Sequence, residues 1–333
     1  MKVLITGATG FIGARLAVLS LEDGHEVTAL GQVNSAVEDE RREELRQHGI
    51  EIMPVSLNDR EALTQAMAGV EVVFHLAAAQ HEANVPDQHF WQVNVEGVRT
   101  LLEIAAEHQV RRFVHGSTIG VYGAALDGEI DEETPLRPDN IYGVTKAEGE
   151  KVVREFGDRL ETVIVRISET FGPGDGRLLK LFRAVDSGKF FMIGTGRNKH
   201  QLIYVDDLVR GLWLAATRPA AVGKVLLLAG REVVTTEDMV SGIATALGAR
   251  TPKLRAPLWP FMAAAVVMET ALRPLGIQPP LHRRRMDFFR KSFYFSCTKT
   301  TDILGAAPAT SFRDGARLTA DWYRSRNWIG RRQ

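Results

Sequence analysis

The sequence predicts an α/β fold with a doubly wound parallel sheet and a smaller lobe attached to it, and two observations lead to this expectation. In the first half of the chain, short runs of Val, Ile, Leu and Phe alternate with longer segments of helical apolar spacing. Such alternation is typical of parallel strands that are buried on both faces and joined by crossover helices. A glycine-rich turn also follows the first apolar run directly and opens the first helical segment, as in Rossmann-type sheets.

The order of the expected elements follows from the spacing of apolar and breaker residues. Strands are expected at residues 2–6, 26–30, 50–54, 70–76, 112–116 and 162–166. Helices are expected at residues 11–21, 35–48, 59–67, 88–107 and 140–156. Right-handed crossovers between these strands place a ligand-binding crevice at the carboxyl ends of the strands.

The turn after the first strand has glycines at positions 7, 10 and 13. Gly7 permits a tight turn, Gly10 lets the backbone approach a pyrophosphate, and Gly13 lets the helix pack close to the strand. The amides at the helix N-terminus then face the phosphates. Packing alone is the less favoured explanation, although the spacing differs from Gly-x-Gly-x-x-Gly. We therefore expect a dinucleotide site.

The residues after the second strand bear on which dinucleotide binds. A protein that binds NAD usually has an acid there to hold the ribose hydroxyl groups. Gly31 and Gln32 stand there instead, so a phosphorylated ribose would not be repelled. Arg41 and Arg42 are close in sequence but are expected on a solvated helix face. The expected cofactor is NAD or NADP, with a slight preference for NADP.

The pattern changes after Arg166, because the loop at 171–176 is rich in breakers and the later elements are shorter. We expect a dinucleotide-binding domain over residues 1–166, with a return segment around 204–228. A smaller mixed α/β substrate-binding lobe is expected over residues 167–203 and 229–333. Within it, residues 261–268 form an apolar run that is too short to span a membrane. A buried or pocket-lining helix is preferred there over a helix on a membrane surface.

Composition limits the classes of partner. The chain has 333 residues and 45% hydrophobic residues, which suffices for a sizeable core. Lys and Arg together number 41, as do Asp and Glu, so nothing suggests a nucleic-acid partner. Cys297 is the single cysteine and cannot form an intrachain disulfide. With no signal-peptide pattern at the N-terminus, we expect a cytoplasmic protein without a membrane span.

A tyrosine and a lysine four residues apart indicate acid/base chemistry. Tyr142 and Lys146 fall on one face of the expected helix at 140–156. An isolated tyrosine has a pKa of about 10, and a nearby ammonium group favours its phenolate. Ser117 and Thr118 follow the expected strand at 112–116, where a hydroxyl group could hold a reacting oxygen. The alternative interpretation, which is the less favoured one, is that these two hydroxyls belong to an ordinary turn at the end of the strand.

Taken together, the motifs resemble the extended short-chain dehydrogenase/reductase superfamily, including its NAD-dependent epimerase/dehydratase family. The matching motifs are Thr-Gly-x-x-Gly-x-x-Gly at 6–13, His75-Leu76-Ala77-Ala78, Asn94, Ser117-Thr118 with Val121-Tyr122-Gly123, Glu133-Thr134-Pro135, Tyr142-x-x-x-Lys146, Phe171-Gly172-Pro173-Gly174 and Tyr204-Val205-Asp206-Asp207. The resemblance implies that Tyr142 is the acid/base, that Lys146 supports it, and that Thr118 holds the reacting oxygen.

The resemblance also implies where the small molecules bind. With the glycine loop, the expected cofactor contacts are Gly7, Thr9, Gly10, Phe11, Ile12, Gly31, Leu57, Leu76, Ala77, Ala78, Asn94, Tyr142, Lys146, Ser168, Thr170 and Pro173. The candidate substrate contacts are Ser117, Thr118, Glu82, Lys199 and Arg284. Solvated loops or basic turns are plainer interpretations of the last three. No metal ligands are expected. A homodimer is implied, formed through the helices at 88–107 and 140–156.

Residue differences narrow the reaction. The resemblance implies an Asp-Glu pair in 4,6-dehydratases, and a Glu in UDP-glucuronate decarboxylases, where Ile119 and Gly120 stand. Those two reactions are therefore disfavoured. Sugar-nucleotide epimerases usually have Arg-Asp where His200 and Gln201 stand.

The C-terminal part, from Phe293 to Lys299 and then through Trp322, resembles the 3β-hydroxysteroid-dehydrogenase-like and dihydroflavonol-reductase-like branch. The leading expectation is reversible hydride transfer between a secondary alcohol or its ketone and nicotinamide. A nucleotide-sugar 4-epimerase with tightly bound NAD is the alternative. A non-catalytic dinucleotide sensor is the least favoured.

Overall fold

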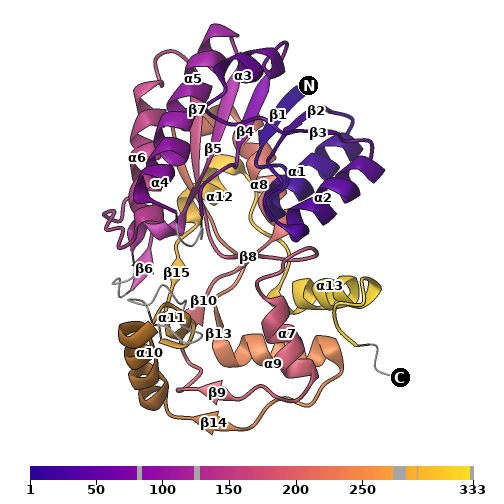
Figure 1. Cartoon of the computed structure of the whole chain (residues 1–333), viewed down its shortest axis with the longest axis vertical. Coiled ribbons are helices and arrows are strands. Elements are labelled where there is room, and N and C mark those ends of the chain that lie inside the picture. Colours follow the sequence, from indigo (N-terminus) through magenta and orange to yellow (C-terminus); the bar gives the residue numbers. More distant parts are fainter. Residues whose placement is uncertain (81–84, 124–127, 273–282, 291, 331–333) are drawn as a thin grey trace.

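The computed structural model describes residues 1–80, 85–123, 128–272, 283–290 and 292–330 (Figure 1). Its main feature is a seven-stranded sheet in the order β12-β7-β5-β4-β1-β2-β3, in which all neighbouring strands are parallel. The strands are β1 Lys2–Thr6, β2 Glu26–Leu30, β3 Ile52–Met53, β4 Val72–His75, β5 Arg112–Thr118, β7 Glu161–Ile167 and β12 Val225–Leu228. The expected doubly wound parallel fold is confirmed.

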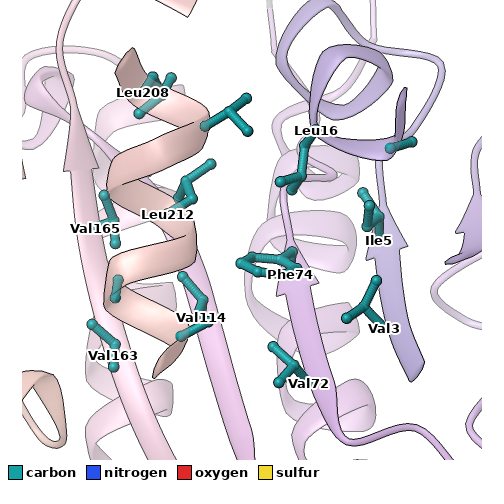
Figure 2. Packing of buried hydrophobic residues seen from close by; sticks show 14 of the residues in the cluster. Val3, Ile5, Leu16, Val72, Phe74, Val114, Val163, Val165, Leu208 and Leu212 are labelled. Carbon is teal, nitrogen blue, oxygen red and sulfur yellow. The ribbon is translucent and has the colours of Figure 1, made fainter. Parts of the chain in front are cut away.

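Helices cover both faces of this sheet (Figure 1). One face carries α1 Phe11–Glu22, α2 Ala36–Gln47 and α8 Val205–Thr217, and the other carries α3 Arg60–Ala66, α5 Gly97–Glu107 and α6 Ile141–Glu155. Figure 2 shows Leu16 of α1 and Leu208 and Leu212 of α8 packed beside the strand side chains. The central parts of the strands are mostly apolar because both of their faces are buried.

The helix expected at 88–107 is interrupted. It consists of α4 Asp87–Trp91, one π turn η1 Gln92–Glu96, and α5. The π turn contains Asn94, which is 1% exposed and hydrogen-bonds the backbone of Ala79. A π turn inserts an extra residue into a helix and often marks a functional position. Apolar periodicity could not reveal it, because the helix continues on both sides.

The second lobe lies below the carboxyl ends of the strands (Figure 1). Its helices α7 Leu179–Asp186, α9 Thr236–Leu247 and α13 Phe312–Ser325 pack around a separate apolar core that includes Phe182, Ile243 and Tyr323. Short strand pairs complete it. These are β8 Thr170–Phe171 with β11 Ile203–Tyr204, β9 Met192–Ile193 with β14 Arg255–Ala256, β10 Lys199–His200 with β13 Val234–Thr235, and β6 Glu129–Ile130 with β15 Tyr294–Phe295.

Three segments that follow β7 in the chain lie against the large sheet. Helix α8 packs on one face and β12 forms an edge, next to β7. The third is α12 Thr298–Leu304, which contacts β12, and Thr300 Oγ1 accepts a hydrogen bond from the Leu227 amide at 2.7 Å. No pattern in the sequence indicated this last contact.

The apolar run at 261–268 belongs to helix α10 Leu258–Leu272, and the expectation of a buried or pocket-lining helix is wrong. Only Ala265 and Glu269 of this helix are buried, whereas Trp259 is 73% exposed and Val267 is 66% exposed. Among the described residues, no helix is long and apolar enough to cross a membrane. Helix α11 Arg283–Arg290 packs beside α10.

Candidate functional site

The glycine loop forms an open backbone wall at the carboxyl end of β1. Gly7 has φ +71°, and a Cβ atom there would lie 2.7 Å from the Ala77 amide nitrogen, so no side chain fits. Gly10 precedes α1, and a Cβ atom at Gly31 would lie 2.9 Å from the Thr9 side chain. Thr9 Oγ1 donates to the Gln32 carbonyl oxygen at 2.8 Å. The loop thus leaves backbone amides accessible at a helix N-terminus, where phosphates bind.

Arg41 differs from its expected place on a solvated face. Its guanidinium group is partly buried and lines the same cleft as the glycine loop. It donates to the carbonyl oxygens of Thr9 at 3.3 Å and Gly174 at 3.0 Å. Arg42, the neighbouring residue, is exposed and pairs with Asp39 at 2.5 Å, as expected for a solvated face. Arg41 therefore places a positive charge beside the end of β2.

Most of the predicted site residues line one cleft of about 1280 Å³. The predicted residues that line it are Gly7, Thr9, Gly10, Phe11, Ile12, Gly31, Leu57, Leu76, Ala77, Ala78, Ser117, Thr118, Tyr142, Ser168 and Thr170. The glycine loop and the end of β5, which carries Thr118, therefore line a common space. This is the crevice at the carboxyl ends of the strands that a doubly wound sheet provides.

Thr118 and Tyr142 are brought together by close backbone packing. Asn140 Oδ1 accepts from the Gly143 amide at 3.0 Å and so begins α6. A Cβ atom at Gly143 would lie 2.7 Å from the Gly120 carbonyl oxygen, so α6 sits tightly against the 3₁₀ helix η2 Ile119–Tyr122. Thr118 Oγ1 accepts from the Gly120 amide at 3.0 Å. Its hydroxyl proton can therefore be donated into the cleft.

Lys146 lies behind Tyr142 and is 1% exposed. Its ammonium group donates to the Gly116 carbonyl oxygen at 2.7 Å, and its Nζ lies 3.3 Å from His115 Nε2. Burial lowers the pKa of Lys146 to about 8. Strand β5 thus holds the ammonium group of Lys146, which follows Tyr142 by about one turn of α6.

Two buried histidines lie beneath Lys146. The rings of His75 and His115 are stacked with centroids 5.3 Å apart, and both side chains are fully buried. Burial, and then the charge of Lys146, lowers the pKa of His75 to about 3 and that of His115 well below its ordinary value. Both rings are therefore neutral at pH 7, so Lys146 carries the charge of this group.

The hydroxyl group of Ser117 has a structural partner. Ser117 Oγ donates to Glu150 Oε1 at 2.6 Å. Glu150 is buried and receives two hydrogen bonds from Arg166, at 3.0 and 2.8 Å. Arg166 also donates to the Tyr122 hydroxyl oxygen at 2.9 Å. Ser117 thus anchors the end of β5 to α6, which leaves Thr118 as the hydroxyl that faces the cleft.

Asn94 lies behind the cofactor wall and does not line the cleft. Its amide exchanges two hydrogen bonds with Ala79, at 2.9 and 3.1 Å, and donates to Thr145 Oγ1 at 3.0 Å. Asn94 therefore ties the loop after β4, which contains Ala77 and Ala78, to the turn of α6 that carries Lys146. Asn94 thus positions the loop that follows β4 relative to α6, and does not itself line the cleft.

The opposite wall of the cleft follows β7. Ser168 is 5% exposed, and its hydroxyl has no hydrogen-bond partner among the described residues. The next residue, Glu169, has a side chain that is 50% exposed, and its Oε2 lies 3.6 Å from His200 Nδ1. Burial would raise the pKa of Glu169, but His200 and Arg177 together hold it below its ordinary value. This wall therefore carries a carboxylate.

Sequence reasoning missed Glu169 and the place of Arg41. Glu169 could have been found, because it follows the carboxyl end of a strand, where the crevice forms. Pro173 does not line the cleft. Lys199 is exposed on β10, with its Nζ 4.4 Å from the centre of the Tyr294 ring, so it lies outside the cleft. Glu82 and the side chain of Arg284 lie outside the described residues.

The fold and the cleft define a dinucleotide-binding α/β enzyme with a Thr-Tyr-Lys site. A profile of the NAD dependent epimerase/dehydratase family matches residues 3–229. The chain belongs to this family, and the expected resemblance is confirmed. The site is thus that of a nicotinamide-dependent enzyme of the short-chain dehydrogenase/reductase type. The choice between NAD and NADP stays a prediction.

Individual relatives differ in activity. A 3beta-hydroxysteroid-dehydrogenase/decarboxylase isoform 2 of Arabidopsis thaliana is 30% identical over 84% of this chain and 53% of that protein. An N-acetyl-alpha-D-glucosaminyl-diphospho-ditrans,octacis-undecaprenol 4-epimerase of Escherichia coli O157:H7 is 28% identical over 93% of this chain and 91% of that protein. The solved UDP-glucuronic acid 4-epimerase of Bacillus cereus, in complex with NAD, superposes with a TM-score of 0.76 at 23% identity, covering 98% and 99% of the two chains.

The described residues fit a nicotinamide dinucleotide. The glycine positions leave a cradle that Cβ atoms would fill, and Arg41 supplies positive charge beside it. Ser168 also offers a buried hydroxyl that has no hydrogen-bond partner within the described part of the chain, close in sequence to Thr170. A polar ligand that spans the cleft would satisfy this group.

Proposed function

We propose that this protein is an NAD(P)-dependent oxidoreductase that transfers hydride reversibly between a secondary alcohol or its ketone and nicotinamide. The observation that carries the proposal is the common cleft of the glycine loop, Thr118 and Tyr142, with the Lys146 ammonium group held behind them. Nicotinamide supplies or accepts the hydride when it is bound. The residues of the chain supply position and proton transfer.

In the oxidation direction, Thr118 donates its hydroxyl proton to the substrate oxygen and orients it. Tyr142 takes the alcohol proton as the hydride leaves the carbinol carbon, which becomes the carbonyl carbon. Lys146 favours the phenolate of Tyr142 through its positive charge. In the reduction direction the same phenol returns the proton to the oxygen. Ile119 and Gly120 offer no further acid or base beside Thr118, which favours simple hydride transfer over elimination.

The substrate end of the cleft favours an uncharged ketone over a sugar diphosphate. Phe288, Phe293 and Ile119 line the cleft, together with Glu169 and its neighbours His200 and Arg177. The Arg177 cation offsets the Glu169 carboxylate, so it is the apolar side chains of this lining that favour an uncharged substrate. The resemblance of the C-terminal part to the 3β-hydroxysteroid-dehydrogenase-like branch, and the plant relative at 30% identity, support the same direction.

A nucleotide-sugar 4-epimerase remains the second candidate. By its name the E. coli relative is a sugar 4-epimerase, although of a sugar linked to undecaprenol by a diphosphate, and the match covers 91% of that protein. Epimerisation uses the same Thr, Tyr and Lys to oxidise and re-reduce one carbon. It differs by consuming no net cofactor. It also requires room for a sugar diphosphate next to Glu169.

Absorbance of the reduced nicotinamide separates the two candidates. The enzyme is incubated with panels of hydroxysteroids, other secondary alcohols and ketones, and UDP-sugars. Stoichiometric cofactor turnover supports the oxidoreductase. Conversion of a UDP-sugar without net cofactor turnover would establish the epimerase instead. Tyr142→Phe should lose at least about 10²-fold in kcat while still binding cofactor. Tyr294→Phe, outside the cleft, should retain full activity and serves as its control.

We also propose a homodimer that forms through the helices α4, α5 and α6. These helices lie side by side on one face of the first domain (Figure 1). Trp91 of α4 is 38% exposed on that surface, and Arg99 pairs with Glu155 across α5 and α6 at 2.8 Å. Light scattering should give the mass of a dimer for the wild type and of a monomer for Trp91→Asp. A monomeric wild type would rule this out. A cytoplasmic location also remains a proposal.

A further inference from the structure

Helix α10 presents apolar side chains to solvent and its charge to the protein. Glu269 is the only charged residue between Leu258 and Leu272, and it is 5% exposed. Trp259, Val266 and Val267 are 73%, 43% and 66% exposed. A helix on a water-facing surface normally has the reverse distribution. Figure 1 shows α10 on the outside of the second lobe, away from the large sheet.

The apolar surface extends beyond the helix. Phe191 is 39% exposed, and its ring centroid lies 5.8 Å from that of Phe261 in α10. Leu254, which is 75% exposed, precedes strand β14, the partner of β9. Single exposed apolar residues are ordinary, but a contiguous group marks an interaction surface. We call Phe191, Leu254, Trp259, Val266 and Val267 the α10 face.

Basic residues precede and follow α10 in the sequence. Residues 250–290 contain eight basic and two acidic residues, in a chain whose 41 basic and 41 acidic residues balance. One of the two acids is the buried Glu269. Arg250, Lys253 and Arg255 are exposed directly before α10, and Arg255 pairs with Glu237 at 2.6 Å. Among the described side chains, Arg250 and Lys253 are exposed next in sequence to Leu254 of the α10 face.

We propose that the α10 face binds the surface of a lipid bilayer that contains anionic lipids, with α10 lying in the plane of the interface. An apolar helix surface enters the boundary between headgroups and acyl chains, and adjacent Lys and Arg residues attract anionic headgroups. Tryptophan, as at position 259, favours this boundary. A second copy fits less well, because a two-fold contact brings the same cations against one another. At 15 residues, α10 is too short to span a bilayer.

Vesicle flotation of the full-length chain tests the proposal. Wild type should float with vesicles of phosphatidylcholine and phosphatidylglycerol, and much less with phosphatidylcholine alone. Added salt should weaken the binding, because it screens the headgroup charge. The double variant Arg250→Gln, Lys253→Gln should bind at least about tenfold more weakly, since each cation near the surface contributes roughly fivefold. Val266→Asp should also lose binding, because it puts a carboxylate on the apolar surface.

Val37→Asp is the matched control. Val37 is 43% exposed on α2, as Val266 is on α10, so the same substitution is made at equal exposure far from the α10 face. It should float like wild type, and circular dichroism should show both variants folded. Failure of wild type to float with either vesicle would overturn the proposal, as would equal flotation of wild type and Val266→Asp. The wild type could also fail to bind vesicles while having a larger mass by light scattering than Val266→Asp. That result would assign the α10 face to a second copy of the chain instead.

Discussion

Nζ of Lys146 lies 3.3 Å from Nε2 of His115, inside the protein and beneath the catalytic cleft. Because the ammonium group can only donate, Nε2 must accept and the ring proton must be on Nδ1. Nδ1 has no hydrogen-bond partner among the described residues. Burying the Nδ1 proton without a partner costs free energy of folding. In return, the neutral imidazole provides an acceptor for Lys146. We expect His115 to stabilise the charged form of that lysine.

His115→Phe removes this acceptor, so the pKa of Lys146 should fall further below its ordinary value. If Tyr142 needs the ammonium group, activity declines as pH rises through the pKa of Lys146, which is about 8. In the variant the decline should begin at lower pH, with little change of kcat on the acidic side. The pH profile of kcat measures this. His108→Phe, at the far end of α5, is the control. An unchanged profile for His115→Phe would leave His115 with a packing role only.

We expect Lys146→Met to lower the activity of the enzyme and to raise the free energy of unfolding of the cofactor-free protein. Burial holds the folded-state pKa at about 8, below the ordinary 10.5. The folded state therefore releases the proton first, and between these values the stability of the wild type rises with pH. At pH 7 the buried ammonium group costs about 3 kcal/mol, which is absent above pH 10.5.

The gain in unfolding free energy of Lys146→Met over wild type should therefore be about 3 kcal/mol larger at pH 7 than above pH 10.5. The variant also loses the hydrogen bond to Gly116, and this loss lowers its free energy of unfolding by the same amount at both pH values. Urea unfolding at the two pH values measures the difference, and kcat should fall at least about 10²-fold. A difference independent of pH would mean that the folded state does not lower the pKa of Lys146.

The features of the fold and site that depend on residues close in sequence could be predicted, whereas those that depend on contacts between distant segments could not. The sheet, the glycine loop and the Tyr142–Lys146 pair depend on local patterns, namely apolar runs, glycine spacing and one helical turn. Arg41 could not be placed from its helix, because its partners are Thr9 and Gly174, which lie in other elements. The apolar run in α10 predicted burial, but no element that the structure describes covers Trp259, Val266 and Val267. The Ser117–Glu150 contact likewise joins β5 to α6 and has no sequence signature.

Arg41→Ala tests the slight preference for NADP. A 2′-phosphate near the end of β2 would gain a charge-assisted bond from Arg41, which no ribose hydroxyl can replace to the same extent. Calorimetry should show roughly tenfold weaker NADPH binding and less than about twofold weaker NADH binding. Arg42→Ala, on the exposed side of the same helix, should change neither. Equal weakening of both cofactors would indicate that Arg41 serves only to hold the loops of Thr9 and Gly174.

Glu150→Gln should destabilise the fold and disturb the site together. Glu150 has a fully buried side chain, and it accepts from Arg166 and from Ser117. Burial alone would raise its pKa, but Arg166 and Ser117 hold that pKa below its ordinary value. Its contribution to stability is therefore present above the ordinary pKa of glutamate and is lost as pH falls through the lower folded-state pKa.

Removing one charge of this buried pair should cost about 3–5 kcal/mol at pH 7, because Arg166 is left without its counter-charge. Glu148→Gln is the matched control on the same helix, since Glu148 pairs with Lys151 at the surface and should change stability by less than about 1 kcal/mol. Urea unfolding compares the two variants. The cost of Glu150→Gln should shrink on acidification, because the wild-type carboxylate is then neutralised as well. Since Ser117 precedes Thr118, we also expect a lower kcat for Glu150→Gln with cofactor affinity retained. If both variants unfold alike, the buried pair does not hold β7 against α6.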